Sequence, residues 1–296
     1  MILEKSGKIC QGLYSIGYHF IPSFLLLSDP PVIFDAGMTI AGPKYLQDLT
    51  HHLGDAHRLG YIFLTHSHFD HCGAVPYMKR NIEGVKIAAS SLAKENLKKP
   101  NAIKLIQRLS ENIEHRFEER IPDNISFDSF EIDITLEDGD ELTLGDGWVV
   151  RVIATPGHTR DAVSFYIPRL KALIPGEATG VYDARNDVQP EFLSSYDEYI
   201  ASLEKLSRLD IELILLPHIH ILTGEDAKAH IQKSIKSTEA LRQRIEIYLA
   251  RHNNDRDAVV QAIFKKDFEE QQLVLQDDQS YLVNLTAKVR AVAEKR

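Results

Sequence analysis

The segment FLTHSHFDHCGA, at residues 63–74, places three histidines and one aspartate within six positions. It begins inside the apolar run YIFLT, which is typical of a buried strand. A strand that ends in polar residues usually delivers them to the rim of a sheet, where ligands bind in α/β structures. The four polar residues are His66, His68, Asp70 and His71.

These four residues have the side chains of a transition-metal site. Residues i and i+2 of an extended segment point to the same side, so His66 and His68 can approach one cation. Asp70 and His71, after a turn, can approach a second point nearby. Neutral imidazole and carboxylate suit zinc, iron or manganese better than magnesium or calcium.

The alternative is that these are ordinary surface residues or buried histidines that satisfy backbone groups, which is the better interpretation of a single histidine. Clustered imidazoles repel one another when protonated, and an enclosed carboxylate is costly to desolvate. Such a cluster is favourable only where a cation compensates, so the H-x-H-x-D-H order predicts a metal site.

Further candidate ligands follow other apolar runs. Each would be an ordinary loop residue if it stood alone, but the repeated order of strand, turn and ligand supports all of them together. They are His158 in TPGHT, Glu177 in PGEATG, and His218 with its rival His220 in LPHIH.

The composition indicates a soluble α/β protein. The 296 residues are 44% hydrophobic and carry a net charge of −9, which argues against a nucleic-acid-binding surface. Two cysteines provide neither a disulfide framework nor a cysteine-type zinc site. The apolar FLLL at 24–27 is too short for a signal peptide or a membrane span. A cytoplasmic protein without membrane contact is expected.

Short apolar runs alternate with helical patterns through most of the chain, which predicts a sheet-and-helix core over 1–225 and a helical extension over 226–296. The charged segment 91–121 has the pattern of a helical insertion. Ser195 and Thr223 are the expected N-caps of two helices. Strands are expected at 32–35, 61–65, 85–89, 131–136, 148–155, 163–167, 171–175 and 211–217, and helices near 43–53, 73–80, 101–118, 196–208 and 225–250.

The motifs THSHFDHCGA, TPGHT, PGEATG and LLPHIHILTG, in that order, resemble those of the metallo-β-lactamase superfamily from about Val32 to Gly224. The resemblance implies an α/β fold, a four-layer αβ/βα sandwich, with two metal ions at one edge of its paired sheets. It also implies a supporting role for Asp35 and a catalytic role for Asp70. The implied ligands are His66, His68 and His158 for the first metal, Asp70, His71 and His218 for the second, and Glu177 as the bridge.

The chain departs from the family pattern at two ligands. The bridging carboxylate is commonly aspartate, whereas Glu177 is one methylene longer and can bridge or bind one metal only. The last histidine normally follows glycine, but here Pro217 precedes it. We expect His218 to be the ligand because it directly follows the turn at Pro217, after which the chain must soon bend into the helix capped by Thr223. His220 remains the alternative.

Two adjacent cations would lower the pKa of a shared water towards neutrality and polarise a carbonyl or phosphoryl oxygen. No G-x-S-x-G turn or phosphate-binding glycine loop offers another mechanism. The prediction is a metal-dependent hydrolase using a metal-bound hydroxide on a small ester or thioester, with two divalent ions, zinc first and iron or manganese next. The layout is similar to the thioesterase-like branch that includes a quinolone-signal response enzyme.

Three alternatives belong to other functional classes. They are a regulatory or partner-binding protein that retains the metal site, a non-haem iron oxidoreductase, and a phosphodiesterase. A flavodiiron oxidoreductase would need a flavodoxin-like domain, which the tail lacks, and a ribonuclease would need a basic arm. The partners expected are a small-molecule substrate, no nucleic acid and no membrane, with a homodimer as an option. The insertion and the tail after Asp226 are expected to restrict access to the metals.

Overall fold

The computed structural model describes residues 2–4, 7–115 and 124–294. The chain forms two compact units, called unit 1 and unit 2 below. Unit 1 comprises Met1–Ala154, Asp161–Gly176 and Glu212–Thr223. Unit 2 comprises Thr155–Arg160, Glu177–Ile211 and Gly224–Arg296. The boundary expected from the sequence, between a core over 1–225 and a helical extension over 226–296, stays a prediction.

Unit 1 contains two seven-stranded sheets. The first has the order β2 (Gly7–Cys10), β3 (Leu13–Tyr18), β4 (Ile21–Leu26), β5 (Val32–Phe34), β6 (Tyr61–Phe63), β7 (Lys86–Ser90) and β8 (Ile134–Leu136). The second has the order β1 (Ile2–Glu4), β16 (His220–Thr223), β15 (Leu213–Leu215), β12 (Ala172–Ile174), β11 (Val163–Ile167), β10 (Val149–Ala154) and β9 (Glu141–Thr143).

Strands β5 to β8 run parallel to one another, and this direction places the start of the candidate site. Phe34 pairs with Phe63 at the ends of β5 and β6. Because the carboxyl ends of parallel neighbours meet at one edge of a sheet, the residues that follow both strands lie together there. Asp35 therefore emerges beside the segment that begins at Leu64.

An aromatic cluster fills the layer between the two sheets. The ring of Phe165 on β11 lies 5.3 Å from that of Phe34 and 5.6 Å from that of Phe63, measured between centroids. All three side chains are buried, and they join aliphatic residues of both sheets in one core. Burying aromatic area of this size is a large favourable term in folding. The predicted α/β sandwich is confirmed.

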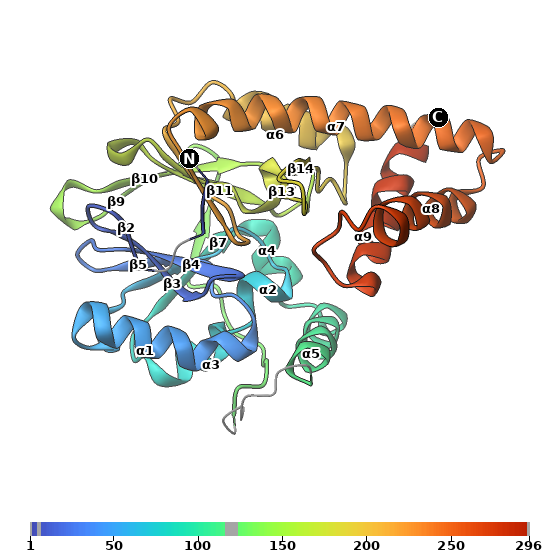
Figure 1. Cartoon of the computed structure of the whole chain (residues 1–296). Helices are drawn as coiled ribbons and strands as arrows, with labels where there is room; N and C mark the ends of the chain where they lie inside the picture. The colour runs from blue at the N-terminus through green and yellow to red at the C-terminus, as the bar shows by residue number, and fades with distance from the viewer. Residues whose placement is uncertain (1, 5–6, 116–123, 295–296) are drawn as a thin grey trace. The chain divides into compact units, whose positions relative to one another are not determined.

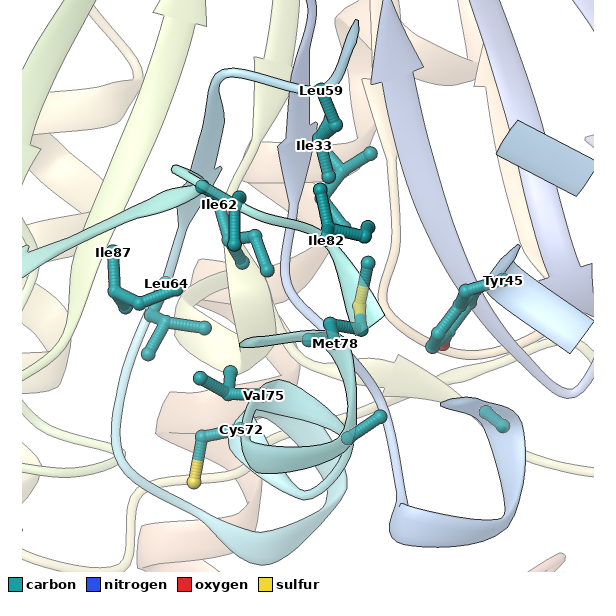
Figure 2. Packing of buried hydrophobic residues seen from close by; sticks show 14 of the residues in the cluster. Ile33, Tyr45, Leu59, Ile62, Leu64, Cys72, Val75, Met78, Ile82 and Ile87 are labelled. Atoms are coloured by element: carbon teal, nitrogen blue, oxygen red, sulfur yellow. The ribbon is translucent and has the colours of Figure 1, made fainter. Parts of the chain in front are cut away.

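A second core lies on the outer face of the first sheet. Helices α1 (Gly42–Leu53) and α3 (Val75–Asn81) run along that face (Figure 1). Met78, Ile33 and Ile62 pack together there, with Cys72 at the margin (Figure 2). The other helices of unit 1 are η1 (Thr39–Ala41), η2 (Ala56–Arg58), α2 (Phe69–Cys72), α4 (Ser91–Asn96), α5 (Pro100–Glu114), η3 (Gly145–Gly147) and η4 (Pro168–Leu170).

The predicted insertion is helical as far as it is described. It forms α4 and α5, and α5 packs against α2, the short helix that carries Asp70 and His71. Thr39 Oγ1 also donates a hydrogen bond to the Glu114 carboxylate at the end of α5. Residues 116–121 of the predicted insertion and the end of the predicted helix over 101–118 lie outside the described residues.

Unit 2 is mainly helical. Helix α7 (Glu225–Arg251) packs against α6 (Tyr196–Leu206), α8 (Arg256–Phe264) and α9 (Asp278–Ala293). Arg244 on α7 makes two hydrogen bonds to Asp267. Within the described chain, no helix combines the length and apolar character needed to span a membrane. The elements are the hairpin β13 (Val181–Tyr182) and β14 (Val188–Gln189), then α6 (Tyr196–Leu206), α7 (Glu225–Arg251), α8 (Arg256–Phe264), the π-helix η6 (Lys265–Glu270) and α9 (Asp278–Ala293); η5 (Gly176–Thr179) begins at the boundary between the units.

The N-cap predictions had opposite outcomes. Ser195 caps α6 as expected, because its side chain accepts a hydrogen bond from the Glu198 N–H. The prediction for Thr223 was wrong. Thr223 pairs with Leu213 as the last residue of β16, so its backbone is extended and Gly224 takes the N-cap position of α7. Strand β16 and the N-terminal strands β1 to β4 were not predicted.

The loop Thr155–Arg160 lies tightly against α6 within unit 2. Gly157 has φ of +132°, and a Cβ there would lie 2.4 Å from the Tyr199 backbone nitrogen. The Ser202 hydroxyl donates to the Pro156 carbonyl at 2.7 Å, and the Ser194 hydroxyl donates to the Gly157 carbonyl at 3.0 Å. Pro156 and Gly157 therefore fix the position of His158 beside α6.

We predict that Gly157→Ala lowers the free energy of unfolding by about 3 kcal/mol or more, because both the backbone angle and the clash oppose it. Gly84→Ala is the control, since Gly84 has φ of +80° but a Cβ added there would have no other atom within 4 Å. It should lose about 1–2 kcal/mol. Urea unfolding measures both. Equal losses would show that the contact with α6 is not tight.

His230 on α7 is fully buried, and its Nδ1 lies 3.2 Å from the Tyr182 hydroxyl. Burial, helped by the nearby Lys233 ammonium, lowers the pKa of His230 to about 4. A histidine with a lowered pKa in the folded state stabilises the fold above its ordinary pKa of about 6.5, and this contribution fades as the pH falls.

We predict that lowering the pH from 7.5 to 5 removes about 2 kcal/mol of stability through His230 alone. Unfolding free energies of the wild type and His230→Gln at both pH values isolate this term by subtraction. An identical pH dependence in wild type and His230→Gln would contradict the prediction.

Candidate metal centre

Asp35 organises the ligand segment of unit 1. Its Oδ1 accepts a hydrogen bond from the Thr65 N–H at 2.7 Å, and its Oδ2 accepts one from the Thr65 hydroxyl at 2.9 Å. The same Oδ2 lies 2.9 Å from His71 Nδ1. A carboxylate can only accept here, so Nδ1 of His71 carries the proton and Nε2 presents its lone pair to Asp70, 3.9 Å away.

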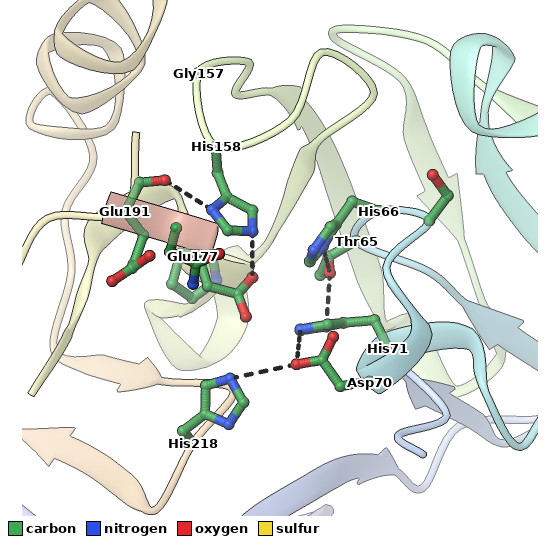
Figure 3. Close-up of polar contacts among 12 residues, drawn as sticks. Thr65, His66, Asp70, His71, Gly157, His158, Glu177, Glu191 and His218 are labelled. Atoms are coloured by element: carbon green, nitrogen blue, oxygen red, sulfur yellow. Dashed lines mark hydrogen bonds and ion pairs between the residues drawn. The ribbon is translucent and has the colours of Figure 1, made fainter. Parts of the chain in front are cut away.

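Asp70, His71 and His218 gather within unit 1. One nitrogen or oxygen of each lies within 4.8 Å of the others. His218 Nε2 is 3.8 Å from Asp70 Oδ2 (Figure 3). Its Nδ1 is 3.4 Å from the Phe20 carbonyl. Asp70 and His71 are on the short helix α2. Their side chains converge, with His71 Nε2 3.9 Å from Asp70 Oδ2.

His66 and His68 are neighbours in unit 1, with ring centroids 4.6 Å apart. His66 is buried and its Nδ1 lies 3.0 Å from the Thr65 hydroxyl. Between them, the Ser67 N–H donates to the Asp161 carboxylate at 2.9 Å. The extended H-x-H segment is thus held by a buried carboxylate from a distant part of the chain.

His158 and Glu177 form the corresponding pair in unit 2. His158 Nε2 lies 3.8 Å from Glu177 Oε2, and both side chains are buried. His158 Nδ1 donates to the Glu191 carbonyl at 2.7 Å (Figure 3). The Tyr199 hydroxyl donates to the Glu177 carbonyl at 3.0 Å. The ring orientation of the histidine and the backbone of the glutamate are therefore both fixed.

The donor set of each unit fits a transition metal. Two atoms bound to one ion at about 2.1 Å lie roughly 3–4 Å apart, and the Nε2-to-carboxylate distances of 3.8 and 3.9 Å fall in this range. In His71, His158 and His218 an oxygen beside Nδ1 leaves Nε2 as the coordinating atom. Nitrogen and carboxylate donors together suit zinc, iron or manganese.

The two histidines of PHIH occupy different structural positions. Strands β15 and β16 are antiparallel neighbours, and the hairpin between them contains His218. His220 begins β16, where it is buried and its backbone pairs with Glu4 of β1. The expectation that the chain soon bends into a helix capped by Thr223 was wrong, because β16 comes first and Gly224 is the N-cap. The position of His218 beside Asp70 still favours it as the ligand.

Cys72 directly follows the candidate ligand His71 and is buried. Burial, together with the charges of Asp70 and Asp161, raises the pKa of the Cys72 thiol well above its ordinary value, so it stays protonated.

Sequence reasoning missed the supporting residues Thr65, Asp161, Glu191 and Tyr199. Thr65 precedes the first histidine and Asp161 follows TPGHT by two positions, but neither carries a pattern that indicates its partner.

Comparisons with known proteins find similar sequences over part of the chain. A hydroxyacylglutathione hydrolase of Brucella anthropi is 36% identical over 119 residues, which are 40% of this chain and 33% of that protein. The chain thus spans about a third of the length of the curated hydrolases it first matches. A metallo-β-lactamase fold-containing protein of Sulfurisphaera tokodaii is 25% identical over 187 residues, or 62% of this chain and 69% of that protein.

Solved structures share the fold. An archaeal metallo-β-lactamase superfamily protein from Sulfolobus tokodaii has a TM-score of 0.60 at 22% identity, covering 96% of this chain and 99% of its own. A metallo-β-lactamase family protein from Thermus thermophilus has a TM-score of 0.69 at 18% identity, covering 97% and 95%. The family model of the metallo-β-lactamase superfamily matches residues 17–218, more than half of the sequence. The chain therefore belongs to the metallo-β-lactamase superfamily.

Proposed function

We propose that this protein is a dinuclear metal-dependent hydrolase that acts on a small ester or thioester. The superfamily consists generally of hydrolytic metalloenzymes. The observation that carries the proposal is the common orientation of His71, His158 and His218, each with Nδ1 against an oxygen and Nε2 turned toward a carboxylate. Hydroxyacylglutathione hydrolase, by its name, cleaves an acylated glutathione, and this partial match favours a thioester.

The resemblance to the superfamily assigns Glu177 as the bridge and His218, not His220, as the last ligand. Zinc is the first candidate metal, with iron or manganese next, because the set contains no thiolate. The complete assignment is His66, His68 and His158 for one ion, Asp70, His71 and His218 for the other, and Glu177 between them.

When bound, two such cations would lower the pKa of a water and polarise the scissile carbonyl. The residues of the chain do the positioning. Asp35 keeps the Nδ1 proton on His71, and the Glu191 carbonyl keeps the one on His158. We assign the catalytic role to Asp70, whose carboxylate can orient the attacking water and take its proton. The water oxygen joins the carbonyl carbon, the C–O or C–S bond breaks, and the proton leaves with the departing group.

We predict about two transition-metal ions per fully loaded chain. His218→Ala should lower the content to about one, because its Nε2 beside Asp70 is lost, whereas His220→Ala should retain both. Elemental analysis after loading with zinc and removal of excess metal measures the ratio. Loss of one ion in His220→Ala but not in His218→Ala would reverse the ligand assignment, and no bound metal in the wild type would refute the proposal.

We predict that Asp70→Ala and His68→Ala each lower kcat/KM for the best substrate by about 100-fold or more while the circular dichroism spectrum is unchanged. The substrates to compare are an ester, a thioester, a lactone and a phosphodiester. Asp257→Ala, an equivalent change at an exposed position on α8, should keep full activity. Glu177→Asp should retain more activity than Glu177→Gln, because negative charge matters before length.

The substrate panel also separates the alternatives. Turnover of the phosphodiester alone would make the protein a phosphodiesterase, and bound metal without turnover of any substrate would favour a regulatory role. Iron retained with oxidase activity would favour an oxidoreductase. A cytoplasmic location, a homodimer, the absence of nucleic-acid partners and the restriction of access by the tail after Asp226 stay predictions.

A further inference from the structure

The contacts that hold Glu191 of unit 2 include a buried ion pair. Its carboxylate lies 2.8 Å from the ammonium of Lys288 on α9, and both side chains are at most 5% exposed. Its N–H donates to the Tyr199 hydroxyl at 3.3 Å. Its carbonyl accepts from His158 Nδ1 at 2.7 Å. Figure 3 shows the carbonyl of Glu191 facing His158 while the carboxylate points away.

Tyr199 connects this residue to the other candidate ligand of unit 2. A hydroxyl has one hydrogen, which goes to the Glu177 carbonyl, and its lone pair accepts the Glu191 N–H. His158 and Glu177 are thus both supported through Glu191 and Tyr199.

We propose that Lys288 is a positioning residue for the metal ligands of unit 2, and that its ion pair with Glu191 raises the affinity of the His158 site for a divalent transition metal. The inference rests on the proposed metal-dependent function. It assigns a role at the metal centre to the C-terminal helix α9, which supplies none of the proposed ligands.

The energetics of the ion pair support this role over a purely structural one. Desolvating two charges can offset their attraction, so a buried pair is a weak source of stability, and in some proteins it fixes a particular arrangement. The helices of unit 2 are also joined by a second ion pair, between Arg244 and Asp267. Asp267 accepts a further hydrogen bond from the Tyr281 hydroxyl. Lys288 instead connects α9 to the residue that orients His158.

Removal of the Lys288 ammonium should disturb the candidate ligand His158 through one intervening residue, Glu191. Without the Lys288 ammonium, the buried Glu191 carboxylate would lose its paired cation and move toward water. This movement loosens the carbonyl of the same residue. The proton of His158 is then no longer confined to Nδ1, and the ring is less well oriented. Loss of such an outer hydrogen-bond partner typically lowers metal affinity about 10–100-fold.

The test is a titration of the metal-free, full-length protein with Zn²⁺ in competition with a chromophoric chelator. Lys288→Met should weaken one of the two Zn²⁺ affinities by about 10-fold or more and leave the other unchanged. Lys288→Arg, which restores a cation to the pair, should recover part of the loss. The visible spectrum of the Co²⁺-loaded protein should change in Lys288→Met, because the coordination geometry of one ion is altered.

Asp267→Asn is the matched control. It weakens an ion pair among the same helices but has no contact with Glu191 among those described, so it should lower the thermal midpoint and leave both Zn²⁺ affinities at the wild-type values. If Lys288→Met lowers the midpoint in the same way and binds Zn²⁺ as the wild type does, the role of Lys288 is structural and the inference is wrong.

A double variant covers the case in which Lys288→Met does not fold. Lys288→Met with Glu191→Gln leaves no unpaired charge, so it should fold, and the missing anchor should still weaken one Zn²⁺ affinity. Wild-type affinity in the folded double variant would overturn the inference. A wild-type protein that binds no Zn²⁺ would instead overturn the proposed function on which the inference rests, so the two failures are distinguishable.

Discussion

The Asp35 carboxylate is buried at the end of β5, and a carboxylate in that position is stable only where donors surround it. Thr65 supplies two donors and His71 supplies a third. Asp35 adopts φ of +60°, a region that aspartate tolerates better than most residues. Its bonds join the end of β5 to the end of β6 and set the start of the ligand segment. The electrostatic requirement of one carboxylate therefore fixes both the position and the protonated nitrogen of a candidate ligand.

Unit 2 meets the same requirement with different groups. A carbonyl, not a carboxylate, accepts the Nδ1 proton of His158, so the imidazole gains less electron density than that of His71. The negative charge is on the side chain of Glu191, not on the carbonyl that accepts the proton, and the Lys288 ammonium neutralises it. In both units the oxygen beside Nδ1 selects the tautomer. They differ in whether a negative charge raises the basicity of the coordinating nitrogen.

The sequence was most informative where a residue acts at the end of its own strand. The strands at 32–35 and 61–65 and the residues after them could be predicted because apolar runs and the turns that follow are local. Asp161 supports Ser67 across 94 positions, and Lys288 reaches Glu191 across 97. Such contacts depend on the tertiary fold and leave no spacing to detect. Thr223 was misassigned for a related reason, because its capping pattern competes with strand pairing to Leu213.

Ile219 separates the two histidines of the turn between β15 and β16. The His220 N–H donates to the His218 carbonyl, which makes Ile219 the centre of a three-residue turn with φ of +59°. A β-branched residue in this region is strained by about 1–3 kcal/mol. The pairing of β16 with both β1 and β15 holds the chain on one side of the turn. The backbone of His220 is held in the ladder on this side of the strained turn, and His218 on the other side lies beside Asp70.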